Sequence, residues 1–186
     1  SIIVPVYNES RTLPMVTERI VKACGDHAQI IYVDDGSTDG SFTILKEYAR
    51  EKDTVLHKEN GGKGSAIRHG LTKATAPLTI IQDADLEYDP AQIPVILEYA
   101  EQHPGHAVFG SRFLESNPNR YRRHLVGNKT LTAIANLLFG GKLTDSYTCY
   151  KLFPTAILKS FPLRANGFEI EAELTGFPLR RGIPID

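Results

Sequence analysis

The chain has 186 residues, of which 41% are hydrophobic and 23% are charged, and its formal net charge is −1. This is the composition of an ordinary globular domain with a hydrophobic core, and it excludes a largely disordered chain. The balanced charge also argues against nucleic acid as the main partner. Cys24 and Cys149 fit no metal-ligand spacing, so we expect two free thiols in a reducing compartment.

Strand-like and helix-like segments alternate over the first 112 residues. Short β-branched runs predict strands at residues 1–7, 29–35, 54–59, 78–83 and 106–112. Helical spacing predicts a helix capped by Asn8 and Ser10 that runs through Cys24, and helices over 41–52, 65–75 and 90–102. This alternation predicts an α/β fold with a doubly wound, mostly parallel sheet between helices. Right-handed crossovers would place all the strand carboxyl ends along one edge, where ligands bind.

The remainder of the chain has a different pattern. A polar, basic loop at 116–124 precedes an amphipathic helix predicted over 125–140. A loop leading into a strand is expected at 143–153, and a helix near 167–182. The apolar stretches are well short of the ~20 residues that span a bilayer. The chain begins in an apolar strand without Met and stops at strand-like residues, so we expect it to be part of a longer protein.

Polar sequences follow four of the predicted strands. They are YNE after the first, DDGSTD after the second, DADLE after the fourth and GSR after the fifth. Because the carboxyl ends of parallel strands meet at one edge, we expect these groups to line a binding cleft.

The sequence DADLEYD places carboxylates at every second position, and carboxylates this close repel one another. A divalent cation would answer this charge, because Mg²⁺ and Mn²⁺ prefer hard oxygen ligands. In an extended chain Asp85 and Glu87 would point to the same side, and Asp83 would share it. Asp89 is better suited to cap the helix that begins at Pro90. The alternative is a solvated acidic turn.

The sequence NGGKG at 60–64 is a glycine-rich loop that runs into a helix. It could present backbone N–H groups and Lys63 to a phosphate. The loop matches neither the P-loop nor the dinucleotide-binding pattern, which argues against those two classes of protein.

Together these motifs resemble a known family. SIIVPVYNES, VDDGSTDGS, NGGKGSAIRHG, QDADLEYDP, FGSRF and LTDSYTCYKLF occur in this order. They resemble the family 2 glycosyltransferases of the GT-A fold, and most of all the polyprenyl-phosphate sugar transferases, the group containing dolichyl-phosphate mannose synthase. The resemblance implies one GT-A domain over 1–186, with a nucleotide-sugar-binding half at 1–112 and an acceptor-binding half at 113–186.

The resemblance also implies roles for individual residues on the donor side. In the family, the first motif lines the nucleotide pocket, and the second carboxylate of DDGS contacts the base. The matching residues are Pro5, Tyr7, Glu9 and Asp35. The DAD motif and the residue two beyond it hold the diphosphate and Mg²⁺ or Mn²⁺. The matching residues are Asp83, Asp85 and Glu87.

Basic residues are implied at the phosphates. The arginine of GSR, Arg112, would face the donor phosphates, and Arg122 or Arg123 would face a lipid phosphate. Breaking the sugar–phosphate bond develops negative charge, which a metal, Arg112 and Lys63 would neutralise. Attack from the opposite face of the sugar would invert the anomeric centre. A phosphate acceptor, largely ionised at pH 7, needs positioning rather than a base. A hydroxyl acceptor would need a base, and Asp145 is the candidate; otherwise Asp145 organises the site.

We therefore expect a metal-dependent enzyme that transfers sugar from a UDP- or GDP-sugar to a polyprenyl phosphate. The alternatives are the same donor chemistry with a hydroxyl acceptor, and a sugar-nucleotide-binding module without turnover. The basic cluster before the helix at 125–140 suits an anionic membrane surface. The expected location is cytoplasmic, either peripheral at the inner face of the membrane or anchored there by segments outside this sequence.

Overall fold

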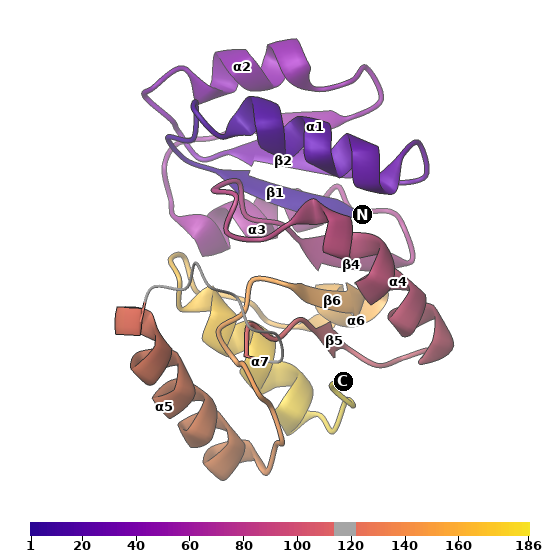
Figure 1. The fold of residues 1–186 in the computed structure, drawn as a ribbon, viewed down its shortest axis with the longest axis vertical. Coiled ribbons are helices and arrows are strands. Elements are labelled where there is room, and N and C mark those ends of the chain that lie inside the picture. Colours follow the sequence, from indigo (N-terminus) through magenta and orange to yellow (C-terminus); the bar gives the residue numbers. More distant parts are fainter. Residues whose placement is uncertain (114–121) are drawn as a thin grey trace.

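The computed structural model describes residues 1–113 and 122–186, with only the backbone for 122–125. A six-stranded sheet in the order β3-β2-β1-β4-β6-β5 forms its centre (Figure 1). The strands are β1 Ile2–Val6, β2 Ile30–Asp34, β3 Thr54–His57, β4 Leu78–Ile81, β5 Val108–Phe109 and β6 Lys151–Pro154.

Four neighbouring strands of the sheet are parallel. β1 pairs with β2 through Ile3 and Ile31, and with β4 through Ile3 and Ile81. These isoleucines are fully buried, as expected for strands covered on both faces. β6 is antiparallel to both β4 and β5. The prediction of a mostly parallel sheet is confirmed, but β6 runs the opposite way, so not all strand carboxyl ends share one edge.

Helices cover the sheet on both sides. α1 contacts α2 and α4, whereas α3 packs on β1 and β2 from behind the sheet in Figure 1. The helices are α1 Leu13–Cys24, α2 Ser41–Tyr48, α3 Lys63–Leu71, the short 3₁₀ turn η1 Pro90–Gln92, α4 Ile93–Gln102, α5 Arg122–Phe139, α6 Thr155–Ser160 and α7 Ile170–Arg180. The α/β fold is as predicted, and α6 is an addition to it.

The predicted cap of the first helix is wrong. α1 begins only at Leu13, with Thr12 as its N-cap. Asn8 instead accepts a hydrogen bond from the Thr38 N–H at 2.8 Å, and the Ser10 N–H donates to Asp39 at 3.0 Å. These polar groups therefore join the turn after β1 to the turn after β2.

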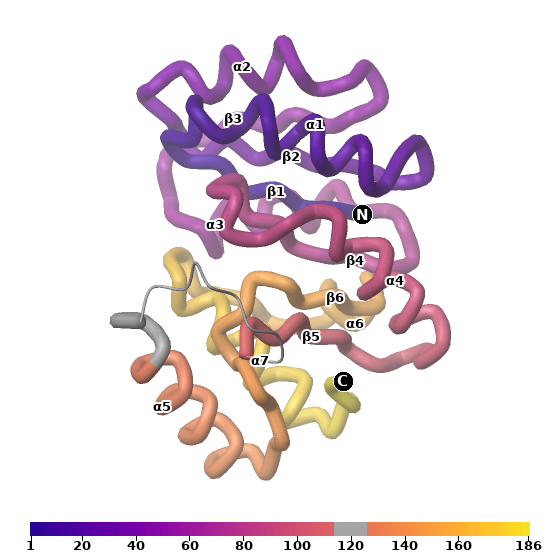
Figure 2. The backbone as a smooth tube through the Cα atoms, in the orientation of Figure 1, coloured from indigo at the N-terminus to yellow at the C-terminus, as the bar shows by residue number. Residues whose placement is uncertain are grey.

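The second half of the chain adds a helical pair beside the sheet. α5 and α7 lie together below β5 and β6 in Figure 2, and they contact each other. No helix in the described part of the chain is long and apolar enough to cross a membrane.

Candidate active site

The acidic sequence after β4 forms a turn. β4 ends at Ile81, and Leu86 has a positive φ of 65°, a left-handed conformation that is unusual for a branched residue. The Glu87 N–H donates to the Asp85 carboxylate at 3.0 Å across this turn. The prediction of an extended chain with its carboxylates on one side is therefore wrong. Asp89 accepts a hydrogen bond from the Ala91 N–H at 3.1 Å, which confirms its role as a cap.

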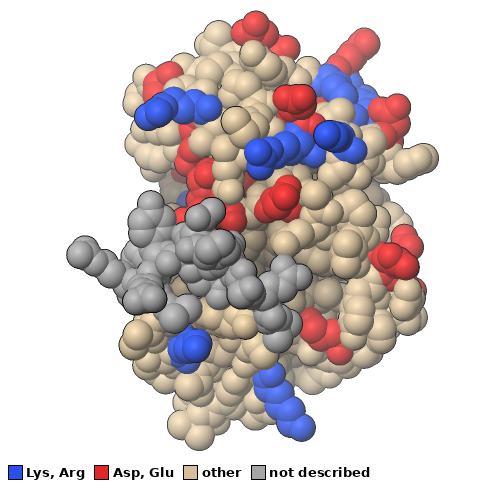
Figure 3. All heavy atoms as spheres, in the orientation of Figure 1, with Lys and Arg blue, Asp and Glu red and all other residues tan. Residues whose placement is uncertain are grey.

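Asp85 carries a negative charge that the protein does not neutralise. Asp85 is exposed at the surface, but desolvation of its carboxylate by the surrounding chain, and then the charges of Asp83, Glu87 and Glu9, raise its pKa to about 6. Within the described residues, neither Asp85 nor Glu87 forms an ion pair. Figure 3 shows acidic side chains gathered in the middle of this face. Such a group of hard oxygens fits a divalent cation.

Asp83 already has a cationic partner. The Lys63 ammonium lies 2.8 Å from one Asp83 oxygen and 2.9 Å from the other. In the described parts of the chain, no three His, Cys, Asp or Glu side chains are arranged to hold a metal ion. A metal bound through both Asp83 and Asp85 would therefore have to replace the ammonium at Asp83.

Lys63 also contacts the second half of the chain. Its ammonium lies 3.0 Å from the Glu171 carboxylate on α7, and Glu171 in turn accepts from the fully buried Lys151 on β6. Burial disfavours the Glu171 carboxylate, but the ammonium groups of Lys151 and Lys63 outweigh it and lower the Glu171 pKa. Burial likewise disfavours charged Lys63, yet Asp83 and Glu171 hold its pKa well above the ordinary value. Both shifts favour the charged forms of Glu171 and Lys63, as their ion pair requires.

Asp35 organises the glycine-rich loop. Its carboxylate is buried and accepts hydrogen bonds from the N–H groups of Gly61 at 3.0 Å and Gly62 at 2.6 Å, and from the Lys58 ammonium. Two of the backbone N–H groups of this loop are therefore taken by Asp35 rather than open to a phosphate. Asp35 was predicted to contact the base; its carboxylate is almost fully enclosed here.

The glycine-rich loop is covered by the segment before α7. Gly62 has a φ of +90°, and a Cβ there would lie 2.6 Å from the Asn166 carbonyl oxygen. The Ser65 N–H donates to this same oxygen at 3.1 Å. The close approach places Lys63 within reach of α7.

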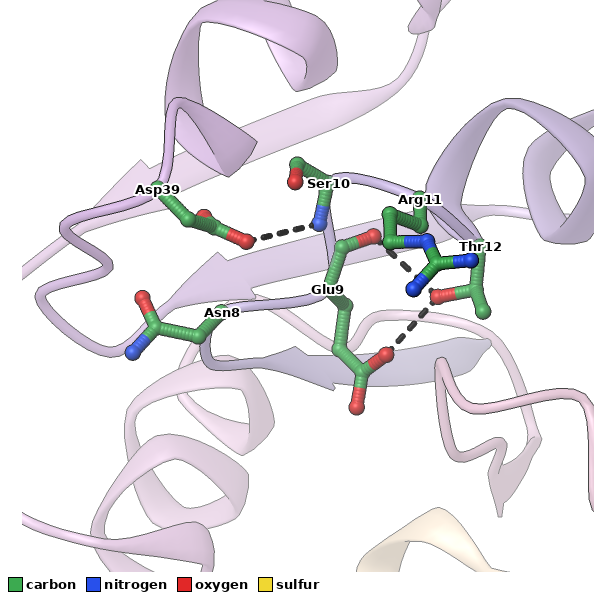
Figure 4. Close-up of a pocket in the computed structure, with 6 residues that line it drawn as sticks. All are labelled: Asn8, Glu9, Ser10, Arg11, Thr12 and Asp39. Atoms are coloured by element: carbon green, nitrogen blue, oxygen red, sulfur yellow. Dashed lines mark hydrogen bonds between the residues drawn. The ribbon is translucent and has the colours of Figure 1, made fainter.

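The first motif borders a shallow pocket. Pro5 lies in β1, and Tyr7, which follows it, is half exposed. The Glu9 carboxylate accepts from the Thr12 hydroxyl at 2.8 Å. Figure 4 shows the lining residues, which come from the turns after β1 and β2: Asn8, Glu9, Ser10, Arg11, Thr12 and Asp39.

Arg112 and Asp145 form a two-point ion pair. Arg112 Nε and Nη2 donate to the two Asp145 oxygens at 2.7 Å and 2.9 Å, and Nη2 also donates to the Tyr147 carbonyl at 3.1 Å. Partial burial disfavours charged Arg112, but the Asp145 contact raises its pKa above the ordinary value. Arg122 and Arg123 begin α5, and their side chains lie outside the described residues.

The family model of "Glycosyl transferase family 2" matches residues 1–161. The chain belongs to glycosyl transferase family 2. Among curated proteins, an undecaprenyl-phosphate 4-deoxy-4-formamido-L-arabinose transferase from Pectobacterium carotovorum is 36% identical over 156 residues, 80% of this chain and 46% of that protein. The protein of the same name from Edwardsiella ictaluri is 30% identical over 185 residues, 90% of this chain and 56% of that protein. The chain thus spans about half the length of the curated relatives it matches.

Solved structures show the same fold. Glucosyl-3-phosphoglycerate synthase from Mycobacterium tuberculosis, in complex with Mn²⁺, UDP and phosphoglyceric acid, has a TM-score of 0.79 and 20% identity, over 99% of this chain and 66% of that one. The same enzyme with UDP has a TM-score of 0.76 and 21% identity, over 99% and 68%. These similarities show that the family 2 chain has a GT-A fold.

Two residues of this family 2 domain, Glu171 and Lys151, were not predicted as parts of its site. Glu173 ties down the loop before α7 by accepting hydrogen bonds from the N–H groups of Arg164 and Ala165. Glu171 instead reaches Lys63 and Lys151. The sequence signal for this pair was Lys151, which stands beside Leu152 in an apolar strand. A buried ammonium requires a buried carboxylate as its partner.

Proposed function

We propose that this family 2 domain transfers a sugar from a UDP- or GDP-sugar to a polyprenyl phosphate, with inversion and with Mg²⁺ or Mn²⁺. The observation that carries this proposal is the uncompensated acidic turn at Asp85, which lies beside Lys63 at the carboxyl end of β4. The names of the curated relatives, undecaprenyl-phosphate sugar transferases, support the choice of acceptor.

The acidic turn would hold the metal through Asp83, Asp85 and Glu87. When bound, the ion would neutralise the charge that develops on the diphosphate leaving group. Lys63 would add a second positive charge on the phosphates, next to Asp83. Pro5, Tyr7 and Glu9 would line the nucleotide pocket at the end of β1. Asp35 supports that pocket by holding the loop that carries Lys63.

Arg112 would bind the donor phosphates with a guanidinium that Asp145 keeps in place. Two hydrogen bonds to Asp145 and one to Tyr147 restrict its rotation, so little conformational freedom is lost on binding. Arg122 and Arg123 would bind the acceptor phosphate. An ionised phosphate attacks without a base, which fits an Asp145 that is engaged by Arg112.

The same ion pair bears on the alternative acceptor. A hydroxyl acceptor requires a base with a free oxygen, and Asp145 is the candidate. Both its oxygens accept from Arg112, and its side chain is buried. The geometry therefore favours a positioning role for Asp145 and a phosphate acceptor. The acidic and basic groups also favour an enzyme over a module that only binds sugar nucleotides.

The polarity of α5 supports a position at the cytoplasmic face of a membrane. Its inward side is polar, because Thr132 binds Ser146 at 3.0 Å and Asn136 binds Leu143. Its outward side is apolar, and several large side chains are exposed on it: Val126, Leu131, Ile134, Leu137 and Leu138. A helix with this polarity suits the interface between headgroups and acyl chains, where a polyprenyl phosphate presents its phosphate.

The proposal is tested with purified protein, a panel of UDP- and GDP-sugars, Mg²⁺ or Mn²⁺, and a short-chain polyprenyl phosphate. We expect a sugar-phosphate lipid with inverted anomeric configuration, and its loss in Asp85→Asn. Asp89→Asn, in the same turn, is the matched control and should keep activity. A donor that binds or hydrolyses without lipid product would point to a hydroxyl acceptor, and no donor binding would contradict the site itself.

A further inference from the structure

Lys63 is shared by two carboxylates from opposite halves of the chain. Asp83 follows β4, whereas Glu171 lies on α7, and the Lys63 ammonium is within 3.0 Å of both. Its side chain keeps about a tenth of its surface exposed, at 11%, while the Glu171 side chain keeps 4% and that of Lys151 none. Asp83, at 21%, is the most exposed member of the network, and Lys63 is the more exposed of its two cations.

The two ends of this network differ in what they would lose if Lys63 moved. Glu171 would still have the buried Lys151 as a partner. Asp83 has Lys63 as its ion-pair partner and would be left with a free carboxylate at the edge of the acidic turn. A buried charge without a partner is costly, so the Glu171–Lys151 pair is the fixed end of the network. Asp83 is the end where another cation can replace the ammonium.

A divalent cation and the ammonium cannot both use Asp83. Lys63 covers both oxygens of this carboxylate, at 2.8 Å and 2.9 Å, and a nearby metal ion would repel its positive charge. Glu171 offers the ammonium a second partner at 3.0 Å without requiring it to leave the site.

We propose that Lys63 is an internal cation that a divalent ion displaces from Asp83, and that Glu171 is the positioning residue that retains the displaced ammonium for the donor diphosphate. This inference rests on the proposed function. It predicts that metal and diphosphate bind cooperatively, because the diphosphate supplies Lys63 with the negative charge that the metal takes away. By linkage, each ligand then raises the affinity for the other by the same factor.

The test is a Mn²⁺ titration, followed by the electron paramagnetic resonance signal of free Mn²⁺, with and without UDP and GDP. Without nucleotide, we expect Lys63→Met to bind Mn²⁺ about tenfold more tightly than the wild type, because its competitor is gone. In the same variant, the increase in Mn²⁺ affinity caused by the nucleotide should be smaller than in the wild type, because the part that passes through Lys63 is lost. A lysine that served only structure would not improve metal binding when removed.

Glu171→Gln should have the opposite effect. Without Glu171, Lys63 depends on Asp83 alone and competes better, so Mn²⁺ binding should weaken about tenfold. In the Lys63→Met background the same substitution should change Mn²⁺ affinity little, which is the non-additivity of coupled residues. Glu173→Gln on the same helix is the matched control, because its amide oxygen still accepts from the backbone. If Glu171→Gln does not fold, the double variant Lys151→Met/Glu171→Gln is titrated in its place, because it lacks the unpaired ammonium.

Two results would overturn the inference, and they are distinguishable. Equal or weaker Mn²⁺ binding by Lys63→Met, with clear binding by the wild type, would refute displacement and leave the metal site intact. No Mn²⁺ binding by the wild type, with or without nucleotide, would refute both the inference and the metal dependence of the proposed function.

Discussion

The Arg112 guanidinium donates two hydrogen bonds to Asp145, so a cation near the acidic turn is fixed by a carboxylate from the second half of the chain. Paired donors and acceptors of this kind set direction as well as distance. The pair therefore joins the segment after β5 to the segment before β6.

The first prediction concerns this pair. Asp145→Asn should lower kcat by about 100-fold, because a displacement of about 1 Å in a phosphate-binding group can cost that much. If Asp145 only positions Arg112, the loss should be equal at every pH from 6 to 9. If Asp145 were instead a general base, the substitution would remove an ionisation from the pH profile of kcat/KM. That result would contradict the positioning role. Tyr147→Phe is the control, because Arg112 contacts only its backbone carbonyl.

The second prediction concerns the acidic turn and pH. The pKa of Asp85 is raised to about 6, above the usual value near 3.9, so the folded chain binds this proton more tightly than the unfolded chain. The metal-free chain should therefore lose stability from this group as the pH rises from about 4 to above 6. Asp85→Asn should raise the Tm at pH 7.5, by about 2–4 °C for each kcal/mol of unfolding free energy that is regained. The rise in Tm should be smaller at pH 4.5. Scanning calorimetry without metal measures this, and a Tm at pH 7.5 below the wild type would contradict it.

The third prediction concerns the buried lysine of β6. Glu171→Gln leaves the fully buried Lys151 ammonium without a carboxylate. Breaking such a pair costs about 3–5 kcal/mol, whereas replacing both members is far less costly. The double variant Lys151→Met/Glu171→Gln should therefore recover most of the lost free energy of unfolding in urea. Equal stabilities for the single and the double variant would show that the charge of Lys151 is not the cause.

The fourth prediction concerns the contact between the glycine-rich loop and the segment before α7. Gly62 (φ 90°, ψ 165°) and Gly25 (φ 58°, ψ −144°) both combine a positive φ with an extended ψ, but a Cβ at Gly25 meets nothing within 4 Å, whereas one at Gly62 meets Asn166. Gly25→Ala measures the backbone strain alone, about 1–3 kcal/mol. Gly62→Ala should cost clearly more in urea unfolding and should also weaken donor binding. Equal losses of unfolding free energy in the two variants would mean that the glycine-rich loop moves away from Asn166 without further loss of stability.

The fifth prediction concerns the outward side of α5. Leu137 is 85% exposed, so a charge there should leave the fold intact. Leu137→Glu should reduce co-sedimentation with anionic phospholipid vesicles about tenfold, because a buried charge disfavours the interface. Gln92→Glu on η1, also exposed, adds the same charge elsewhere and should bind as the wild type does. Equal loss in both variants would indicate electrostatic repulsion alone.

The sequence determined the succession of strands and helices, the acidic motif after β4 and the cap at Asp89. Each of these is encoded within a few residues: apolar periodicity, a carboxylate beside a proline, charges placed close together. The order of the motifs was also enough to indicate the family.

Only the tertiary structure decided which groups pair with one another through hydrogen bonds and ion pairs. The enclosure of Asp35 by Gly61 and Gly62 and the bridge from Lys63 to Glu171 both depend on segments that are distant in sequence. The reversed direction of β6 is of the same kind. Local patterns fix which residues are buried, but a buried charge takes its partner from whichever segment packs against it, and that packing is settled only when the whole domain folds.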